Sequence, residues 1–232
     1  MPSHRTDAAP LGRPVLVLNF KAYPSVLGPG AERVARTLED LGRAAGVAVA
    51  VAPATPDLGR LASSLRIPVL AQHVDPVDPG AHTGFVPPES VAAVGAQGSL
   101  VNHSEHPLSP AETRETVTRL HRLNLVSVVC ARDQRAARRL ARTRPAYLAV
   151  EPPELIGGDR AVSTARPEVV SGTVRAVAAI SPTTSVLCGA GVHRRKDVAV
   201  ALELGARGIL VASAVTRATS PRGAIEELLA GF

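Results

Sequence analysis

The chain has 232 residues, of which 45% are hydrophobic, and it carries a formal net charge of +6. This length and apolar content exclude a disordered tail or a mini-protein and predict one domain with a full hydrophobic core. The positive charge is scattered, and aromatic residues make up only 2% of the chain, so the stacking surfaces typical of nucleic-acid-binding proteins are missing. We therefore expect no nucleic-acid partner.

The chain also lacks the signals of membrane insertion and secretion. No segment reaches the roughly 18 consecutive apolar residues of a membrane span. Residues 1–13 lack the apolar block of about 7–15 residues that a signal peptide requires, and we interpret them as a loose tail. Cys130 and Cys188 lie far apart with no metal-ligand spacing, which predicts two buried thiols without a function. We expect a cytoplasmic protein with no membrane partner.

Eight short apolar runs alternate along the chain with segments of helical period. The runs are Val15–Leu18, Val47–Ala52, Val69–Ala71, Ser99–Val101, Leu125–Cys130, Ala146–Val150, Ser185–Leu187 and Gly208–Val211. Strands that alternate with helices in one domain predict an α/β fold, a (β/α)8 barrel over residues 14–232. A doubly wound open sheet is the alternative, but its glycine fingerprint after the first strand is absent.

The intervening segments carry helix signals of two kinds. Apolar residues fall on one helical face at Val34, Leu38, Leu41 and Ala45 and again at Ala136, Ala137, Leu140 and Ala141. Ser109-Pro110-Ala111-Glu112 combines a capping serine, a proline at the first helical position and a glutamate that reaches back, and Ser220-Pro221 repeats the first two signals. These segments therefore predict helices between the strands.

In such a barrel the functional groups follow the carboxyl ends of the strands, and phosphate is held after the seventh and eighth. Polar or glycine-rich segments follow five predicted strands: 19–21, 102–105, 151–153, 189–191 and 212–213. They bring an amine, an imidazole and a carboxylate to one rim, beside turns whose N–H groups can hold an anion. Gly189 and Gly191 are also explained by a tight turn that needs positive φ.

These strand ends resemble the triosephosphate isomerases, in the short form typical of archaea. The similar segments are 19–21 (Asn-Phe-Lys), 71–76, 82–84, 102–105 (Asn-His-Ser-Glu), 151–157 (Glu-Pro-Pro-Glu-Leu-Ile-Gly), 188–192 and 204–213. They follow the family order from about Val15 to the C-terminus. The resemblance implies interconversion of dihydroxyacetone phosphate and D-glyceraldehyde 3-phosphate through an enediolate, with no metal or organic cofactor.

The resemblance also implies roles for the rim residues. Glu151 would be the base, since a carboxylate facing a water-poor pocket gains basicity by desolvation. His103 would be the neutral electrophile that shuttles protons between the substrate oxygens. The pairing of a glutamate base with a neutral histidine is taken from the triosephosphate isomerase family itself. Lys21 would supply positive charge and Asn19 a hydrogen bond. We expect Glu105 to support the rim and hold Lys21.

A phosphate seat and a lid complete the expected site. The residues expected to contact the substrate phosphate are Ile156, Gly157, Gly191, Ala212 and Ser213. The interval between the sixth and seventh predicted strands is the longest in the chain. Its extra length lies in Pro152 to Ala165, where a lid is expected. A variable surface loop is the alternative interpretation of this segment.

The lid tip departs from the family pattern. Where the family usually has Ile-Gly-Thr-Gly, this chain has Ile156-Gly157-Gly158-Asp159. Asp159 brings a carboxylate toward a phosphate dianion, and Gly158 loosens the tip. We expect a raised KM and measurable methylglyoxal, both reduced when Gly158-Asp159 is changed to Thr-Gly. Unaltered KM and by-product yield would mean that Asp159 points away from the site.

The expected partners are a sugar phosphate and further copies of the chain. The segment from Val74 to Pro88 carries four prolines and lies where the family places its dimerisation loop, with Thr83 near a neighbour's active site. The resemblance implies a homodimer or homotetramer.

Two other functions stay open. One is an isomerase of the same mechanism that acts on a related sugar phosphate, such as a four-carbon one. The other is a barrel that binds a sugar phosphate without turnover. The complete set of Asn19, Lys21, His103 and Glu151 disfavours the second, because a pure binder needs no base.

Overall fold

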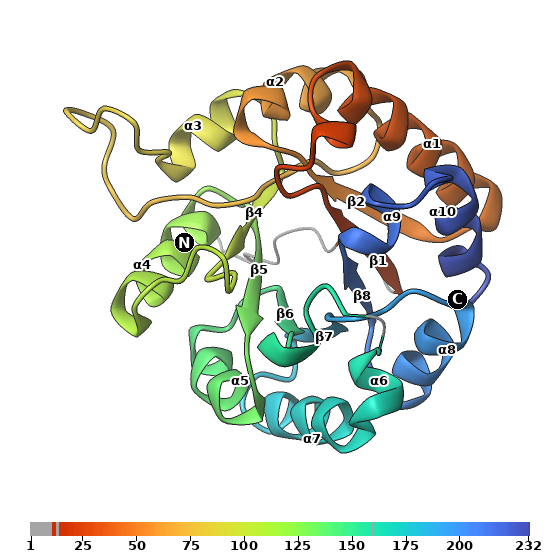
Figure 1. The fold of residues 1–232 in the computed structure, drawn as a ribbon. Coiled ribbons are helices and arrows are strands. Elements are labelled where there is room, and N and C mark those ends of the chain that lie inside the picture. Colours follow the sequence, from red (N-terminus) through yellow and green to blue (C-terminus); the bar gives the residue numbers. More distant parts are fainter. Residues whose placement is uncertain (1–10, 13, 159) are drawn as a thin grey trace.

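The computed structural model describes residues 11–12, 14–158 and 160–232. Their eight strands form one sheet in the order β2-β1-β8-β7-β6-β5-β4-β3, and the paired strands are parallel. Val51 in the edge strand β2 forms a parallel bridge with Val69, the residue directly before the other edge strand, β3. This bridge closes the sheet into a barrel surrounded by helices (Figure 1), which confirms the predicted (β/α)8 fold.

Helices follow the strands around the barrel. The strands are β1 (Val15–Asn19), β2 (Ala48–Ala52), β3 (Leu70–Ala71), β4 (Gly98–Val101), β5 (Val126–Ala131), β6 (Tyr147–Val150), β7 (Ser185–Cys188) and β8 (Gly208–Val211). The α-helices are α1 (Pro29–Ala45), α2 (Thr55–Ser64), α3 (Pro88–Ala93), α4 (Pro110–Arg122), α5 (Gln134–Leu140), α6 (Val162–Ala165), α7 (Pro167–Ala178), α8 (Arg195–Glu203), α9 (Ser213–Thr216) and α10 (Pro221–Leu229). The 3-10 helices in the described ranges are η1 (Pro24–Val26), η2 (Ala141–Thr143) and η3 (Pro153–Leu155).

Side chains along each strand alternate between the inside of the barrel and the surrounding helices. In β1, Val15 and Val17 belong to the interior cluster, whereas Leu16 belongs to the cluster between strands and helices. The interior cluster also contains Leu100, Val126, Val128, Cys130, Tyr147, Ala149, Leu187 and Leu210. The residue two positions beyond an interior residue therefore lies on the same inner face. This alternation brings Asn19, after Val17, and Glu151, after Ala149, to the mouth of the barrel.

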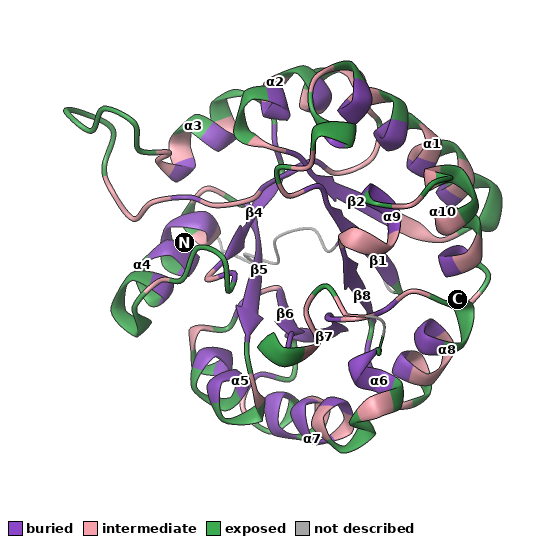
Figure 2. Ribbon diagram, in the orientation of Figure 1, coloured by how far each residue is buried: buried purple, intermediate pink, exposed green. Residues whose placement is uncertain are grey.

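Burial follows this architecture, with buried strands and exposed outer faces of the helices (Figure 2). The apolar faces predicted for two helices are buried at Val34, Leu38, Ala136, Ala137, Leu140 and Ala141. Leu41 on the same helical face is half-buried, and Ala45 is exposed because it is the last residue of α1, where the chain turns at Gly46 in the left-handed conformation. No helix within the described ranges combines the length and apolarity needed to cross a bilayer.

The predicted helix starts are confirmed. The Ser109 hydroxyl accepts a hydrogen bond from the Glu112 N–H at 3.2 Å, and the Glu112 carboxylate accepts one from the Ser109 N–H at 2.8 Å. The Ser220 hydroxyl accepts the Gly223 N–H at 3.2 Å. Such caps satisfy N–H groups that have no partner inside the helix, and they begin α4 and α10 at the expected prolines.

Most of the expected N-terminal tail, residues 1–10 and 13, lies outside the described residues. Leu11 is buried in the interior cluster of the barrel. The carbonyl of Gly12 accepts a hydrogen bond from the Tyr147 hydroxyl at 3.0 Å. Leu11 and Gly12 therefore contact the amino ends of the strands, while the domain boundary at residue 13 stays a prediction.

Gly208, the first residue of β8, tests the packing of the sheet. Its φ is +142°, and a Cβ there would overlap the carbonyl oxygen of Val15 in β1. We expect Gly208→Ala to lower the free energy of unfolding by about 2–4 kcal/mol and Tm by roughly 5–15 °C. The control is Gly59→Ala in α2, where a Cβ makes only ordinary contacts and alanine favours the helix. Equal Tm values for the two variants would contradict this account.

Candidate active site

The structure brings the predicted catalytic residues together at the carboxyl ends of β1, β4 and β6. Asn19, Lys21, His103 and Glu151 line one small cavity. The predicted phosphate contacts Ile156, Gly157, Gly191, Ala212 and Ser213 line the same cavity. Asn19, His103 and Glu151 are buried, so the reactive groups are shielded from bulk water while they face a shared space.

Lys21 is held in place by three neighbours. Its Nζ forms an ion pair with Glu105 Oε1 at 2.7 Å, the contact expected from the sequence. Its backbone N–H donates to Asn19 Oδ1 at 2.9 Å. Gln72 Nε2, after β3, donates to the Lys21 carbonyl at 2.9 Å and to Asn19 Oδ1 at 3.2 Å. These bonds stabilise the left-handed backbone of Lys21, whose φ is 52°.

The proton on His103 is located by its backbone partner. The N–H of Glu105 donates to His103 Nδ1 at 3.2 Å. Because Nδ1 accepts a hydrogen bond, the proton of the neutral ring is on Nε2. Nε2 lies 3.9 Å from Glu151 Oε2. The imidazole therefore presents an N–H donor to the space shared with the carboxylate.

Glu151 has the properties of a poised acceptor. Its Oε2 is buried and has no hydrogen-bond partner within the described part of the chain. An unsatisfied buried carboxylate oxygen is costly and therefore uncommon. A Cβ at Gly189 would overlap the Glu151 side chain, so this glycine makes room for the carboxylate. The explanation by positive φ was wrong for Gly189 and is confirmed for Gly191, whose φ is 69°.

Both cysteines are buried free thiols, as predicted. Burial, followed by the negative charge of Glu151, raises the pKa of the Cys130 thiol well above its ordinary value. Burial raises the pKa of Cys188 to about 12. Both side chains are therefore neutral thiols at physiological pH. Among the residues that the structure describes, no group of three or more His, Cys, Asp or Glu side chains is arranged to hold a metal ion.

The expected phosphate seat consists of backbone groups. Gly157, Gly191 and Ser213 lie around the cavity, and their N–H groups have no acceptor within the described ranges. Gly157 and Gly191 have φ values of 73° and 69°, a conformation that glycine adopts without strain. Unpaired N–H groups that converge on one space bind anions. The arrangement therefore suits a phosphate group.

The segment expected to form a lid borders the same cavity. It contains η3 and α6 (Figure 1), and Ile156 and Gly157 between them line the cavity. The segment is anchored at its far end, where the Val162 N–H donates to the Ala190 carbonyl at 3.2 Å. Asp159 lies outside the described residues, so the expected effect of its carboxylate stays a prediction.

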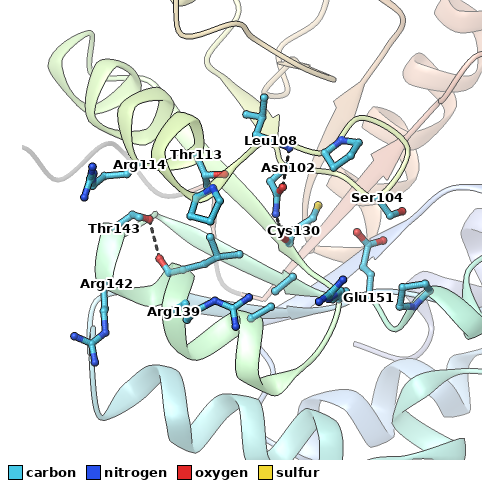
Figure 3. A pocket seen from close by; sticks show the side chains of 17 residues that line it. Asn102, Ser104, Leu108, Thr113, Arg114, Cys130, Arg139, Arg142, Thr143 and Glu151 are labelled. Atoms are coloured by element: carbon cyan, nitrogen blue, oxygen red, sulfur yellow. Dashed lines mark hydrogen bonds between the residues drawn. The ribbon is translucent and has the colours of Figure 1, made fainter.

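Asn102, at the end of β4, ties the loop that carries His103 to the next strand. Its Nδ2 donates to the Cys130 carbonyl at 3.0 Å, and its Oδ1 accepts the Leu108 N–H at 2.9 Å. Figure 3 shows these bonds on the wall of a second cavity, of about 700 Å³, which Glu151 also lines. The φ of Asn102 is 59°, in the left-handed region, which asparagine tolerates better than most residues. Sequence reasoning gave this asparagine no role of its own.

Comparison with known proteins agrees with this geometry. The family model described as triosephosphate isomerase matches residues 14–228. The chain belongs to the triosephosphate isomerase family. Similar proteins include the triosephosphate isomerases of Methanothermus fervidus, 43% identical over 219 residues that cover 94% of this chain and 99% of the relative, and of Caldivirga maquilingensis, 44% identical over 215 residues that cover 93% and 96%. Both relatives are archaeal, as the resemblance to the short form of the family implied.

Variants of Asn102 test how the family's histidine is positioned in this chain. Asn102→Gly keeps the left-handed backbone but loses both side-chain bonds, so we expect kcat to fall about tenfold because the His103 loop becomes looser. Asn102→Ala adds backbone strain, and its Tm should be lower than that of the glycine variant. Steady-state kinetics and thermal unfolding measure the two effects. Wild-type kcat in both folded variants would show that Asn102 does not position His103.

Proposed function

We propose that the site interconverts dihydroxyacetone phosphate and D-glyceraldehyde 3-phosphate, with Glu151 as the base and His103 as the electrophile. The observation that carries this proposal is the buried Oε2 of Glu151, which has no hydrogen-bond partner among the described residues and lies 3.9 Å from Nε2 of His103. A free acceptor beside an N–H donor suits removal of a proton from carbon next to a polarised carbonyl.

In the proposed reaction Glu151 takes a proton from the carbon beside the substrate carbonyl. The electron pair of the C–H bond forms the C=C bond of an enediolate, and the carbonyl oxygen takes the negative charge. Glu151 then returns the proton to the neighbouring carbon, which moves the carbonyl by one position. One carboxylate suffices for both steps because the two carbons are adjacent.

The neighbouring groups stabilise the enediolate and move its oxygen-bound proton. His103 Nε2–H donates to one substrate oxygen and recovers a proton from the other. The Lys21 ammonium provides positive charge for the phosphate and the oxyanion, and the Asn19 amide donates a hydrogen bond to the same region. Glu105 supports both Lys21 and His103 without contacting the substrate. Each proton that a group takes from the substrate is returned to it, so the overall reaction neither consumes nor releases a proton.

The N–H groups of Gly157, Gly191 and Ser213 hold the phosphate in this proposal, together with Ile156 and Ala212. The lid excludes water from the enediolate, which otherwise loses phosphate to give methylglyoxal. The similar proteins are triosephosphate isomerases, which does not favour the two alternatives, a same-mechanism isomerase of four-carbon sugar phosphates and a non-catalytic binder. Coupled turnover of glyceraldehyde 3-phosphate beside erythrose and erythrulose phosphates separates all three.

We further propose a cytoplasmic enzyme of glycolysis and gluconeogenesis that works as a homodimer or homotetramer. Two buried free thiols suit a reducing compartment. The segment from Val74 to Pro88 stands out from the barrel between β3 and α3 (Figure 1). Phe85 on this segment is 52% exposed, and Thr83 lines a groove beside Lys21 and His103. A second copy that covers this segment would bury Phe85.

The base is tested by Glu151→Gln, which keeps the shape of the side chain and removes the proton acceptor. We expect kcat to fall by roughly 10²–10⁴-fold while the affinity for inorganic phosphate is retained. The matched control is Glu115→Gln on the exposed face of α4, which should leave kcat unchanged. A Glu151→Gln enzyme with more than about a tenth of wild-type turnover would exclude Glu151 as the base.

The assembly is tested by sedimentation velocity at micromolar concentration. We expect the mass of a dimer or tetramer, and we expect Phe85→Asp to shift the distribution toward the monomer because an aspartate cannot be buried without a partner. A wild-type monomer with full activity would contradict the proposed assembly.

A further inference from the structure

His193 lies at the phosphate seat, but neither the sequence resemblance nor the proposed reaction uses it. It follows the glycine-rich turn after β7 and lines the same cavity as Gly157 and Ser213. Its backbone N–H donates to Asp197 Oδ2 at 3.1 Å, and Asp197 is a buried residue in the first turn of α8. The backbone of His193 is therefore fixed to the barrel, and only its side chain reaches outward.

That side chain contacts the tip of the lid. His193 Nε2 lies 2.9 Å from the carbonyl oxygen of Gly158. A carbonyl can only accept, so Nε2 carries the proton and donates. Gly158 follows Gly157, and the Gly158 N–H donates to the Leu155 carbonyl at 3.2 Å. The turn that presents the Gly157 N–H to the phosphate is thus held at its end by an imidazole from the barrel.

The other hydrogen bonds of the lid lie away from the tip. Val162 N–H donates to the Ala190 carbonyl, and the Ser163 hydroxyl donates to the Asp197 carbonyl at 2.8 Å. Glu154 forms an ion pair with Arg166 at the start of α7. For the tip residues Ile156 to Gly158, the bond from His193 is the one hydrogen bond to the barrel found within the described ranges. Loss of this bond would free the tip and leave both ends anchored.

We propose that His193 is a positioning residue that holds the lid closed over the substrate phosphate. Its bond to the Gly158 carbonyl keeps the Gly157 N–H at the phosphate seat and keeps water away from the enediolate. Because this role serves the proposed isomerisation, the inference rests on the proposed function. It concerns the closure of the lid, however, and closure can be measured without turnover.

Hydrogen–deuterium exchange of the peptide spanning 153–160 tests closure directly, with inorganic phosphate present and absent. We expect His193→Ala to raise the exchange rate of this peptide about threefold to tenfold, the range that corresponds to one lost hydrogen bond. His193→Gln, whose amide can donate to the same carbonyl, should restore protection. The matched control is Lys196→Ala. Lys196 is exposed in the first turn of α8, three residues after His193, and forms no hydrogen bond or ion pair with the described tip residues 156–158. This variant should show the exchange rate of the wild type.

Kinetics provide the second readout. We expect His193→Ala to raise KM for glyceraldehyde 3-phosphate about threefold to tenfold and to raise the methylglyoxal formed per turnover, while kcat stays within about twofold. His193→Gln should reverse both changes. If the alanine variant does not fold, His193→Asn replaces it, because the shorter amide cannot reach the Gly158 carbonyl.

Two results would overturn the inference. One is a folded His193→Ala enzyme with wild-type exchange, KM and by-product yield. The other is a His193→Gln enzyme that is as impaired as the alanine variant, which would mean that the bond to Gly158 is not what matters. If the wild-type protein does not turn over triose phosphates, the proposed function fails, whereas the exchange experiment still decides whether His193 holds the lid.

Discussion

Closure of the parallel sheet is the constraint on which the rest of the structure depends. The bridge between Val51 in β2 and Val69, directly before β3, joins the two edges of the sheet, so the carboxyl ends of all eight strands meet at one rim. Because side chains alternate along a strand, closure also decides which residues face inward there. Asn19 and Glu151 each stand two positions after an interior residue of β1 and β6. They point into one space because the barrel is closed.

The polar groups at this rim are held by one another. Glu105 contacts Lys21 through its carboxylate and His103 through its backbone N–H. One residue therefore orients the Lys21 ammonium and determines which ring nitrogen of His103 carries the proton. Gln72 fixes Asn19 and Lys21 from the neighbouring strand. Glu151 is the exception, since one of its oxygens has no partner within the described residues. We assign the proton transfer to this oxygen.

Much of this could be predicted from the sequence. The eight strands and the caps at Ser109 and Ser220 are local signals, and the spacing of strand ends was enough to collect Asn19, Lys21, His103 and Glu151 on one rim. Gln72 and His193 were not assigned a role because their contacts join segments that are distant in sequence. Gly189 was explained by backbone conformation, whereas the space beside it is occupied by the Glu151 side chain from the end of the neighbouring strand, β6. Such contacts depend on tertiary structure and leave no local pattern.

The central claim is that carbon-bound hydrogen moves as a proton through a carboxylate base. The most direct measurement is turnover of glyceraldehyde 3-phosphate in D2O, with the dihydroxyacetone phosphate product examined by NMR. A base such as Glu151 can exchange its proton with solvent while the enediolate is bound, so the account predicts deuterium on the carbon that receives the proton. Product formed at the wild-type rate with no deuterium at that carbon would point to direct hydride transfer and would contradict the account.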